Sequence, residues 1–260
     1  MKRRSTLSMC ELFAVTAKRK ITVNDTLKTF YSHSEEHKNG WGIYLKDDAS
    51  EIIVKEYLKA TDSLYLKALL EQKLETKLCI AHIRSATIGE VSDNNAHPFT
   101  GIDKFGRQWV LCHNGTLFDA PELDKYHYIQ EGSTDSERLF LYLLERMNGL
   151  DVADAEDRMR LIEDVITKVV PGNKVNLMIY DGEYLYVHKN EPGTLHAKTT
   201  PDGIIFSTHP LDDGHWTEVP TNCLQVYKDG DLVYEGRRHD YTYIYDPEKM
   251  KVVFMAYAGL

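Results

Sequence analysis

Two segments in the middle of the chain repeat their apolar residues at the three- and four-residue steps of a helix. The first runs from Leu139 to Met147, follows the helix-start sequence TDSE at 134–137, and is ended by Asn148-Gly149. The second carries its apolar stripe between Ile162 and Val169 and is ended by Pro171-Gly172. The same spacing, less regular, predicts helices over about 25–33 and 63–75.

Short runs rich in β-branched, aromatic and aliphatic residues predict many strands. They cover 52–57, 78–83, 109–113, 175–180, 184–188, 204–207, 224–227, 232–234, 241–245 and 252–257. Asp181-Gly182 and Asp229-Gly230 have the form of hairpin turns. The pattern predicts an α+β domain in which two packed antiparallel sheets bury their outer faces under helices. A doubly wound nucleotide-binding fold is disfavoured, because strands and helices do not alternate and no glycine-rich phosphate loop is present.

The composition of the 260 residues narrows the class of protein. With 31 Lys and Arg against 40 Asp and Glu, the net charge is −9. This charge argues against a protein that binds nucleic acid or anionic membranes in general. No run of 18 apolar residues is present, so we expect a cytoplasmic protein. The four cysteines form no CxxC pair, which makes a zinc site or a disulfide scaffold unexpected. Without repeats or linkers, residues 10–260 are predicted to form a single domain.

Cys10 directly follows Met9 and has two interpretations. As an ordinary cysteine it is a small buried apolar residue near the start of a strand. If translation starts at Met9, or residues 1–9 are removed as a leader, Cys10 becomes the first residue and carries a free α-amine. Such an amine titrates near pH 8 and accepts a thiol proton at cellular pH, so nucleophile and base would belong to one residue.

Three further segments carry candidate chemistry, each with a structural alternative. Arg84 follows a predicted strand and is either a surface ion-pairing residue or a fork for a substrate carboxylate. Asn114-Gly115 is a hairpin turn or an oxyanion hole, in which the asparagine amide and the glycine N–H both donate. Asp135 is the first-turn acid of a helix or a group that binds a substrate ammonium. His97, before a proline, is expected to be a packed loop histidine.

Taken together, these segments resemble the glutaminase domain of the class II glutamine amidotransferases, which are N-terminal nucleophile hydrolases. Each motif alone is weak, but six of them stand in the family's order and spacing over about residues 10–150. They are Cys10 after Met9, NGWGI at 39–43, RSATIG at 84–89, NAHPF at 95–99, HNGTL at 113–117 and TDSE at 134–137. Two positions depart from many members of the family, which have an aromatic residue at Ser85 and a histidine at Ile88.

The resemblance implies a four-layer α/β/β/α sandwich and a site that hydrolyses glutamine through a γ-glutamyl thioester. In that site Cys10 is the nucleophile, with its own α-amine as base and acid. Asn114 and the Gly115 N–H form the oxyanion hole. Arg84 with Thr87 holds the glutamine α-carboxylate, and Asp135 holds its α-ammonium. No metal or organic cofactor is implied.

About 110 residues follow position 150, which complete the sandwich but leave no room for a synthetase domain. The chain therefore resembles the small stand-alone members, and any ammonia-accepting enzyme is expected to be a separate chain. The substrate is expected to be L-glutamine. Two alternatives stay open: a γ-glutamyl amide hydrolase that accepts a larger leaving group, and a non-catalytic glutamine-binding regulatory protein.

Overall fold

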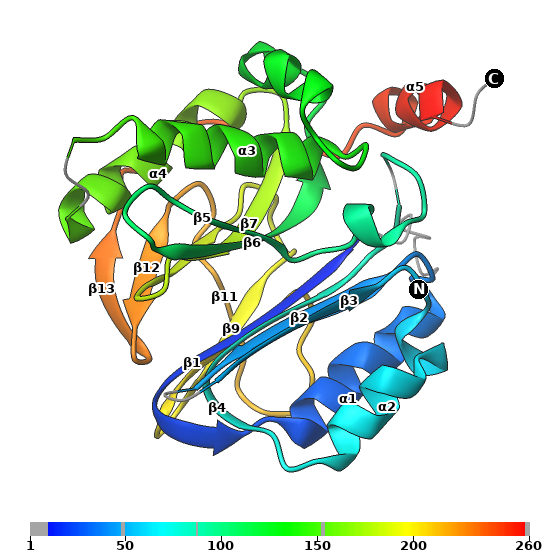
Figure 1. Cartoon of the computed structure of the whole chain (residues 1–260), viewed down its shortest axis with the longest axis vertical. Coiled ribbons are helices and arrows are strands. Elements are labelled where there is room, and N and C mark those ends of the chain that lie inside the picture. The colour runs from blue at the N-terminus through cyan, green and yellow to red at the C-terminus, as the bar shows by residue number, and fades with distance from the viewer. Residues whose placement is uncertain (1–9, 48–49, 87, 152–153, 258–260) are drawn as a thin grey trace.

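Two antiparallel sheets form the centre of the protein in a computed structural model that describes residues 10–47, 50–86, 88–151 and 154–257 (Figure 1). The seven-stranded sheet has the order β11-β9-β10-β1-β4-β2-β3. Its strands are β1 (Glu11–Thr22), β2 (Trp41–Lys46), β3 (Glu51–Glu56), β4 (Glu75–Ile83), β9 (His196–Thr200), β10 (Gly203–Ser207) and β11 (Thr217–Glu218). The central pair, β1 and β4, places Glu11 opposite Ile83.

The six-stranded sheet has the order β13-β12-β8-β7-β6-β5. Its strands are β5 (Phe99–Ile102), β6 (Gln108–Thr116), β7 (Lys174–Tyr180), β8 (Leu185–His188), β12 (Gln225–Lys228) and β13 (Asp231–Glu235). In the register of β6 on β7, Asn114 lies opposite Asn176 and Thr116 opposite Lys174. This pairing brings residues some 60 positions apart in the chain to the same end of the sheet.

Helices cover both outer faces (Figure 1). α1 (Asn24–Ser32) and α2 (Leu64–Glu71) lie on the seven-stranded sheet, and α3 (Asp135–Asn148) and α4 (Ala155–Val169) lie on the six-stranded sheet. Short 3-10 helices are η1 (His33–Glu35), η2 (Ala60–Asp62), η3 (Asp93–Asn95) and η4 (Pro121–Tyr128). The C-terminal helix α5 (Pro247–Tyr257) lies beside this sandwich. The predicted four-layer α/β/β/α arrangement is confirmed.

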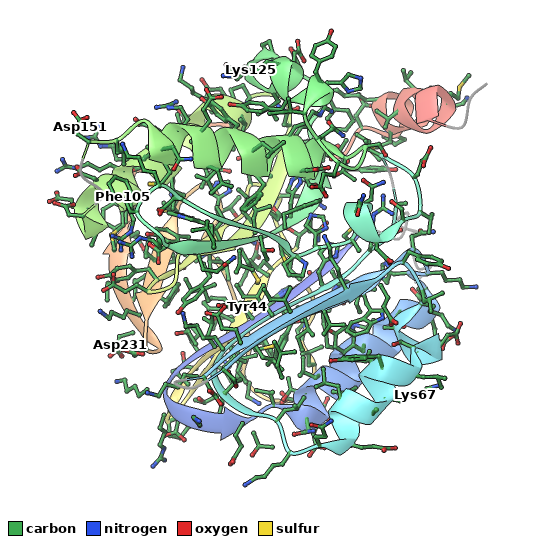
Figure 2. All side chains as sticks on the ribbon, viewed as in Figure 1. Tyr44, Lys67, Phe105, Lys125, Asp151 and Asp231 are labelled. Atoms are coloured by element: carbon green, nitrogen blue, oxygen red, sulfur yellow. The ribbon has the colours of Figure 1, made fainter. Side chains whose placement is uncertain are left out.

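Alternation along the strands creates three separate apolar layers, because successive side chains point to opposite faces of a sheet. In β1, Phe13 and Val15 pack against α1 and α2, whereas Leu12 and Ala14 face the other sheet. Figure 2 shows Tyr44 in this middle layer, where it is fully buried. Since both faces of the central strands are buried, these strands read as continuous apolar runs in the sequence.

Helices α3 and α4 both begin with a side-chain cap, and the cap at Thr134 is the helix start that TDSE predicts. The Thr134 hydroxyl accepts a hydrogen bond from the Glu137 N–H at 3.2 Å, and Asp154 accepts one from Asp157 at 2.9 Å. Such caps contribute about 1 kcal/mol each by satisfying amides that lack a helical partner. The cap at Thr134 thereby fixes the position of Asp135, the next residue.

Three local expectations were wrong. Residues 241–245 form no strand: they run as an irregular segment held by its hydrogen bonds to Asn190. Residues 252–257 belong to helix α5 rather than to a strand. Asn114-Gly115 lies inside β6 and not in a hairpin turn. The pairing of β6 with β7 overrides the local preference of Asn-Gly for a turn.

Candidate active site

Cys10 directly precedes β1, and its thiol lies against the backbone of the segment that follows β4. The Ser85 N–H donates to Cys10 Sγ, and the thiol lies within hydrogen-bond distance of the Ser85 carbonyl, both at 3.3 Å. The side chain is half-buried. Pairing of β1 with β4 accounts for this contact, because it sets Glu11 beside Ile83 and so brings Cys10 to residues 84 and 85.

Opposing influences set the pKa of the Cys10 thiol. Burial is the largest and raises the pKa, because it disfavours the thiolate. The Ser85 N–H and the positive charges of Arg84 and Lys174 lower it, and the Asp135 carboxylate raises it. The net direction is upward, so the thiol is protonated near neutral pH. A nucleophile in this setting needs a base to remove its proton.

Asn114 and Gly115 lie side by side in β6, and both are tightly enclosed. Asn114 is 1% exposed, and its Oδ1 accepts no hydrogen bond from the described residues. A β-carbon on Gly115 would lie 2.0 Å from the Lys174 carbonyl oxygen and 2.3 Å from His113 Nε2. Only glycine therefore fits at 115, since any other residue would push β6 away from β7.

Arg84 is buried and anchors the loop that follows it. Its Nη1 donates to the Glu90 carbonyl at 2.9 Å, and its Nη2 donates to the Ile88 and Gly89 carbonyls at 3.0 and 3.3 Å. These three bonds use at most three of the five N–H donors of a guanidinium. The surface position that one interpretation of the sequence allowed is contradicted, because the side chain is inside the protein.

Asp135 begins α3 and points back to the end of β6. Its Oδ2 accepts from the Leu117 N–H at 2.7 Å, and its Oδ1 accepts from the Ser136 N–H at 2.9 Å. The residue is 4% exposed, and its charge acts on Cys10 and Arg84. It is thus both a first-turn helix acid and a neighbour of the thiol.

A cavity of about 1140 Å³ opens beside the thiol, with Cys10 and Asn114 in its wall. Its ionisable lining includes Glu11, His33, His37, Lys174, Glu191 and His209. Arg84 and Asp135 act on Cys10 electrostatically but do not line this cavity. Thr87 and residues 1–9, the predicted leader, lie outside the described residues.

Two groups near the thiol were not among the residues selected from the sequence. The Glu11 carboxylate lies 2.8 Å from His33 Nδ1 and 3.1 Å from His37 Nε2, and the pKa of Glu11 is lowered to about 2 against the opposing effect of burial. Lys174 Nζ lies 2.7 Å from Glu191 Oε2. A charged residue inside a strand is the one available sequence signal, and Lys174 fits it.

The residues that the structure describes contain no group of three or more histidine, cysteine, aspartate or glutamate side chains arranged to hold a metal ion. Among the same residues, every helix is too short or too polar to cross a membrane.

Sequence comparison identifies relatives over most of the chain. An uncharacterized protein of Methanocaldococcus jannaschii is 30% identical over 258 aligned residues, which cover 88% of this chain and 72% of that protein. A Haemophilus influenzae protein named "Putative glutamine amidotransferase" is 28% identical over 228 residues, covering 76% of each chain.

Solved structures share the fold. Glutamine phosphoribosylpyrophosphate amidotransferase from B. subtilis superposes with a TM-score of 0.66 at 18% identity, over 88% of this chain and 49% of that one. This chain therefore spans about half of that enzyme. A Pseudomonas aeruginosa protein described as a "predicted glutamine amidotransferase" has a TM-score of 0.56 at 20% identity, over 88% of this chain and 97% of the other.

The profile described as "Glutamine amidotransferases class-II" matches residues 9–202, which include the predicted site residues Cys10, Arg84, Thr87, Asn114, Gly115 and Asp135. This match spans well over half of the 260 residues. The chain therefore belongs to the class II glutamine amidotransferases, enzymes with an N-terminal nucleophile fold that act on the side-chain amide of glutamine.

Proposed function

We propose that the mature protein begins at Cys10 and hydrolyses the side-chain amide of L-glutamine to glutamate and ammonia. The observation that carries the proposal is the position of the Cys10 thiol. The thiol lines the same cavity as Asn114, and the opposite charges of Arg84 and Asp135 act on its pKa. A thiol between an oxyanion donor and two opposite charges suits a substrate that is itself a zwitterion.

The reaction begins with transfer of the thiol proton to the α-amine of Cys10. The thiolate attacks the side-chain carbonyl carbon of glutamine, and the oxyanion that forms is stabilised by the Asn114 amide and the Gly115 N–H. The C–N bond breaks as the α-ammonium returns a proton to the departing ammonia. A γ-glutamyl thioester on Cys10 remains. Water, deprotonated by the same amine, breaks the C–S bond and releases glutamate, and the thiol regains its proton.

The environment of the thiol supports an amine base. Burial raises the pKa of Cys10, so little thiolate forms spontaneously at neutral pH. A neutral amine on the same residue removes the proton without a second side chain. While residues precede Cys10, its nitrogen is part of a peptide bond and cannot act as a base. Activity should therefore depend on removal of residues 1–9.

Arg84 is proposed, with Thr87, to hold the α-carboxylate of glutamine, and Asp135 to hold its α-ammonium. Arg84→Ala is expected to raise the KM for glutamine about 10- to 100-fold, since a hydrogen bond to a charged group contributes about 1.5–3 kcal/mol. The kcat should fall less than KM rises. Steady-state kinetics of ammonia release measure both. An unchanged KM would remove Arg84 from this role.

Arg160→Ala is the matched control for that experiment. Arg160 forms an exposed ion pair with Glu156 within α4, away from the cavity. Exposed pairs of this kind contribute about 0–1 kcal/mol. The control should keep the parental KM, which separates loss of a substrate contact from a general effect of losing a guanidinium.

The volume of the cavity favours a second candidate function, hydrolysis of a larger γ-glutamyl amide. Sites for drug-sized ligands measure about 300–1000 Å³, and the cavity beside Cys10 exceeds that range at about 1140 Å³. If ammonia is the leaving group, it occupies very little of this volume. A separate chain that accepts ammonia is the corresponding proposed partner if glutamine is the substrate.

The function is tested with two forms of the protein, one beginning at Cys10 and one retaining residues 1–9, each verified by intact mass. We expect the first to release ammonia from glutamine and to form an adduct at Cys10 with diazo-oxo-norleucine, located by peptide mass. Faster cleavage of bulky γ-glutamyl amides than of glutamine would favour the second candidate. A trimmed protein that cleaves none of these compounds and forms no adduct would contradict both and favour a non-catalytic regulatory protein.

A further inference from the structure

Lys174 is a charged side chain buried beside the nucleophile that no step above uses. We propose that its ammonium, held in place by Glu191, is a positioning residue that stabilises the negative charge formed on Cys10 Sγ. This inference rests on the proposed role of Cys10 as nucleophile. It adds a second cation to the site, supplied by a strand of the opposite sheet.

The backbone places Lys174 at the site. Lys174 is the first residue of β7 and pairs with Thr116, two positions beyond Asn114 in β6. Its carbonyl oxygen lies 3.1 Å from His113 Nε2. Its side chain lines the cavity together with Cys10 and Asn114, although it is only 3% exposed. The strand pairing that positions Asn114 thus also places Lys174 in the wall of the cavity that Cys10 lines.

The ion pair with Glu191 holds the charge of Lys174 in a buried place. Burial lowers the pKa of Lys174, while Glu191 and the Cys10 thiolate raise it. A buried ammonium retains its proton only when such partners offset the loss of hydration. The distance of 2.7 Å from Nζ to Glu191 Oε2 is that of a direct contact. Glu191 thus keeps the cation in place.

The charges around the thiol come from both sheets and from a helix. Arg84 follows β4, Lys174 begins β7 and Asp135 begins α3, and all three act on Cys10. Along the cavity lie Glu11, His33, His37, Glu191, His209 and Glu35–Glu36. Among the charges that act on Cys10, two cations oppose one carboxylate, and this balance favours the thiolate. Without Lys174, Arg84 is the one cation left among them to oppose Asp135 and burial.

Lys189 provides an internal comparison. It is as buried as Lys174 and is paired with Glu218, and burial lowers its pKa as well. Glu218 and Glu191 raise its pKa, Cys10 is not among the groups that shift it, and Lys189 does not line the cavity. Lys189 is therefore a buried, paired lysine outside the cavity wall and serves as the control.

The test measures the rate of Cys10 alkylation by iodoacetamide against pH in the trimmed protein, with the adduct identified by peptide mass. Lys174→Met is expected to shift the profile to higher pH and to slow alkylation at pH 7 about tenfold. The kcat for glutamine should fall by a similar factor while KM changes little. Lys174→Arg should restore most of the rate, and Lys189→Met should keep the parental profile.

A parental profile in Lys174→Met would overturn the proposal, as would an equal shift in Lys189→Met. Circular dichroism and thermal melting identify a variant that has not folded, and Lys174→Gln then takes the place of the methionine variant. Alkylation needs no turnover, so the role of Lys174 is measured even if glutamine proves not to be the substrate. Conversely, a protein that hydrolyses glutamine with an unshifted Lys174→Met profile would keep the proposed function and lose this inference.

Discussion

Cys10→Ser is expected to lower the rate of ammonia release from glutamine by about 10³-fold or more, while the protein keeps its fold. Serine has nearly the shape of cysteine, and the Ser85 N–H that donates to the thiol at 3.3 Å is able to donate to a hydroxyl as well. Packing therefore changes little. What changes is the nucleophile, because a hydroxyl gives up its proton far less readily than a thiol.

Steady-state ammonia release by the trimmed protein measures this loss, and the thermal melting temperature checks that the fold survives. Cys223→Ser is the matched control: Cys223 is buried, and its thiol lies 3.1 Å from the Gly236 carbonyl, to which a serine hydroxyl would also donate. We expect parental activity in that control. Parental activity in Cys10→Ser would instead exclude Cys10 as the nucleophile.

Acidification is expected to destabilise the protein strongly through its buried histidines. Burial lowers the pKa of His82 to about 3 from an ordinary 6.5, and burial together with the neighbouring His239 lowers that of His188 to about 3. Because the unfolded chain binds these protons below pH 6.5 and the folded protein does not, stability falls between pH 6.5 and 3. At pH 5 each histidine removes about 2 kcal/mol, so the two together remove about 4 kcal/mol.

The free energy of unfolding from urea titrations at pH 7.5 and pH 5 measures this effect. Burial also lowers the pKa of His97, which adds to the loss of stability at low pH. His188→Gln should flatten the dependence on pH, since glutamine has no proton to gain. His127→Gln, at an exposed position of η4, should leave it unchanged. Equal stability of the parent at the two pH values would contradict the assignment of these histidines as neutral and buried.

Local patterns were sufficient where an element is determined by its own residues. Helix α3 was predicted from its apolar stripe and its N-terminal cap, and α4 from its apolar stripe and the Pro171-Gly172 end. The hairpin turn before β13 was predicted from Asp229-Gly230, whose two residues both have positive φ. The same reasoning failed at 252–257, where an apolar run forms helix α5. A short apolar run has no period that distinguishes a strand from a helix.

The candidate site likewise contains residues that the sequence indicated and residues that only the tertiary structure brings there. The motifs were sufficient to select Cys10, Arg84, Asn114 and Asp135, because each residue type has chemistry of its own and the motifs stand in the order of a known family. Nothing local connects Lys174 with Cys10, since the contact depends on the register of β6 on β7 and on the packing of the two sheets. The same holds for His33 and His37, which reach Glu11 from η1 and from the segment after it.

The sequence by itself determined the class of fold, the family and the residues able to do chemistry, because these follow from periodicity, residue type and the order of motifs along the chain. Only the tertiary structure decided the electrostatic environment of the Cys10 thiol. The pKa of Cys10 depends on burial and on charges from positions 84, 135 and 174, and Coulomb interactions act through space regardless of separation along the chain.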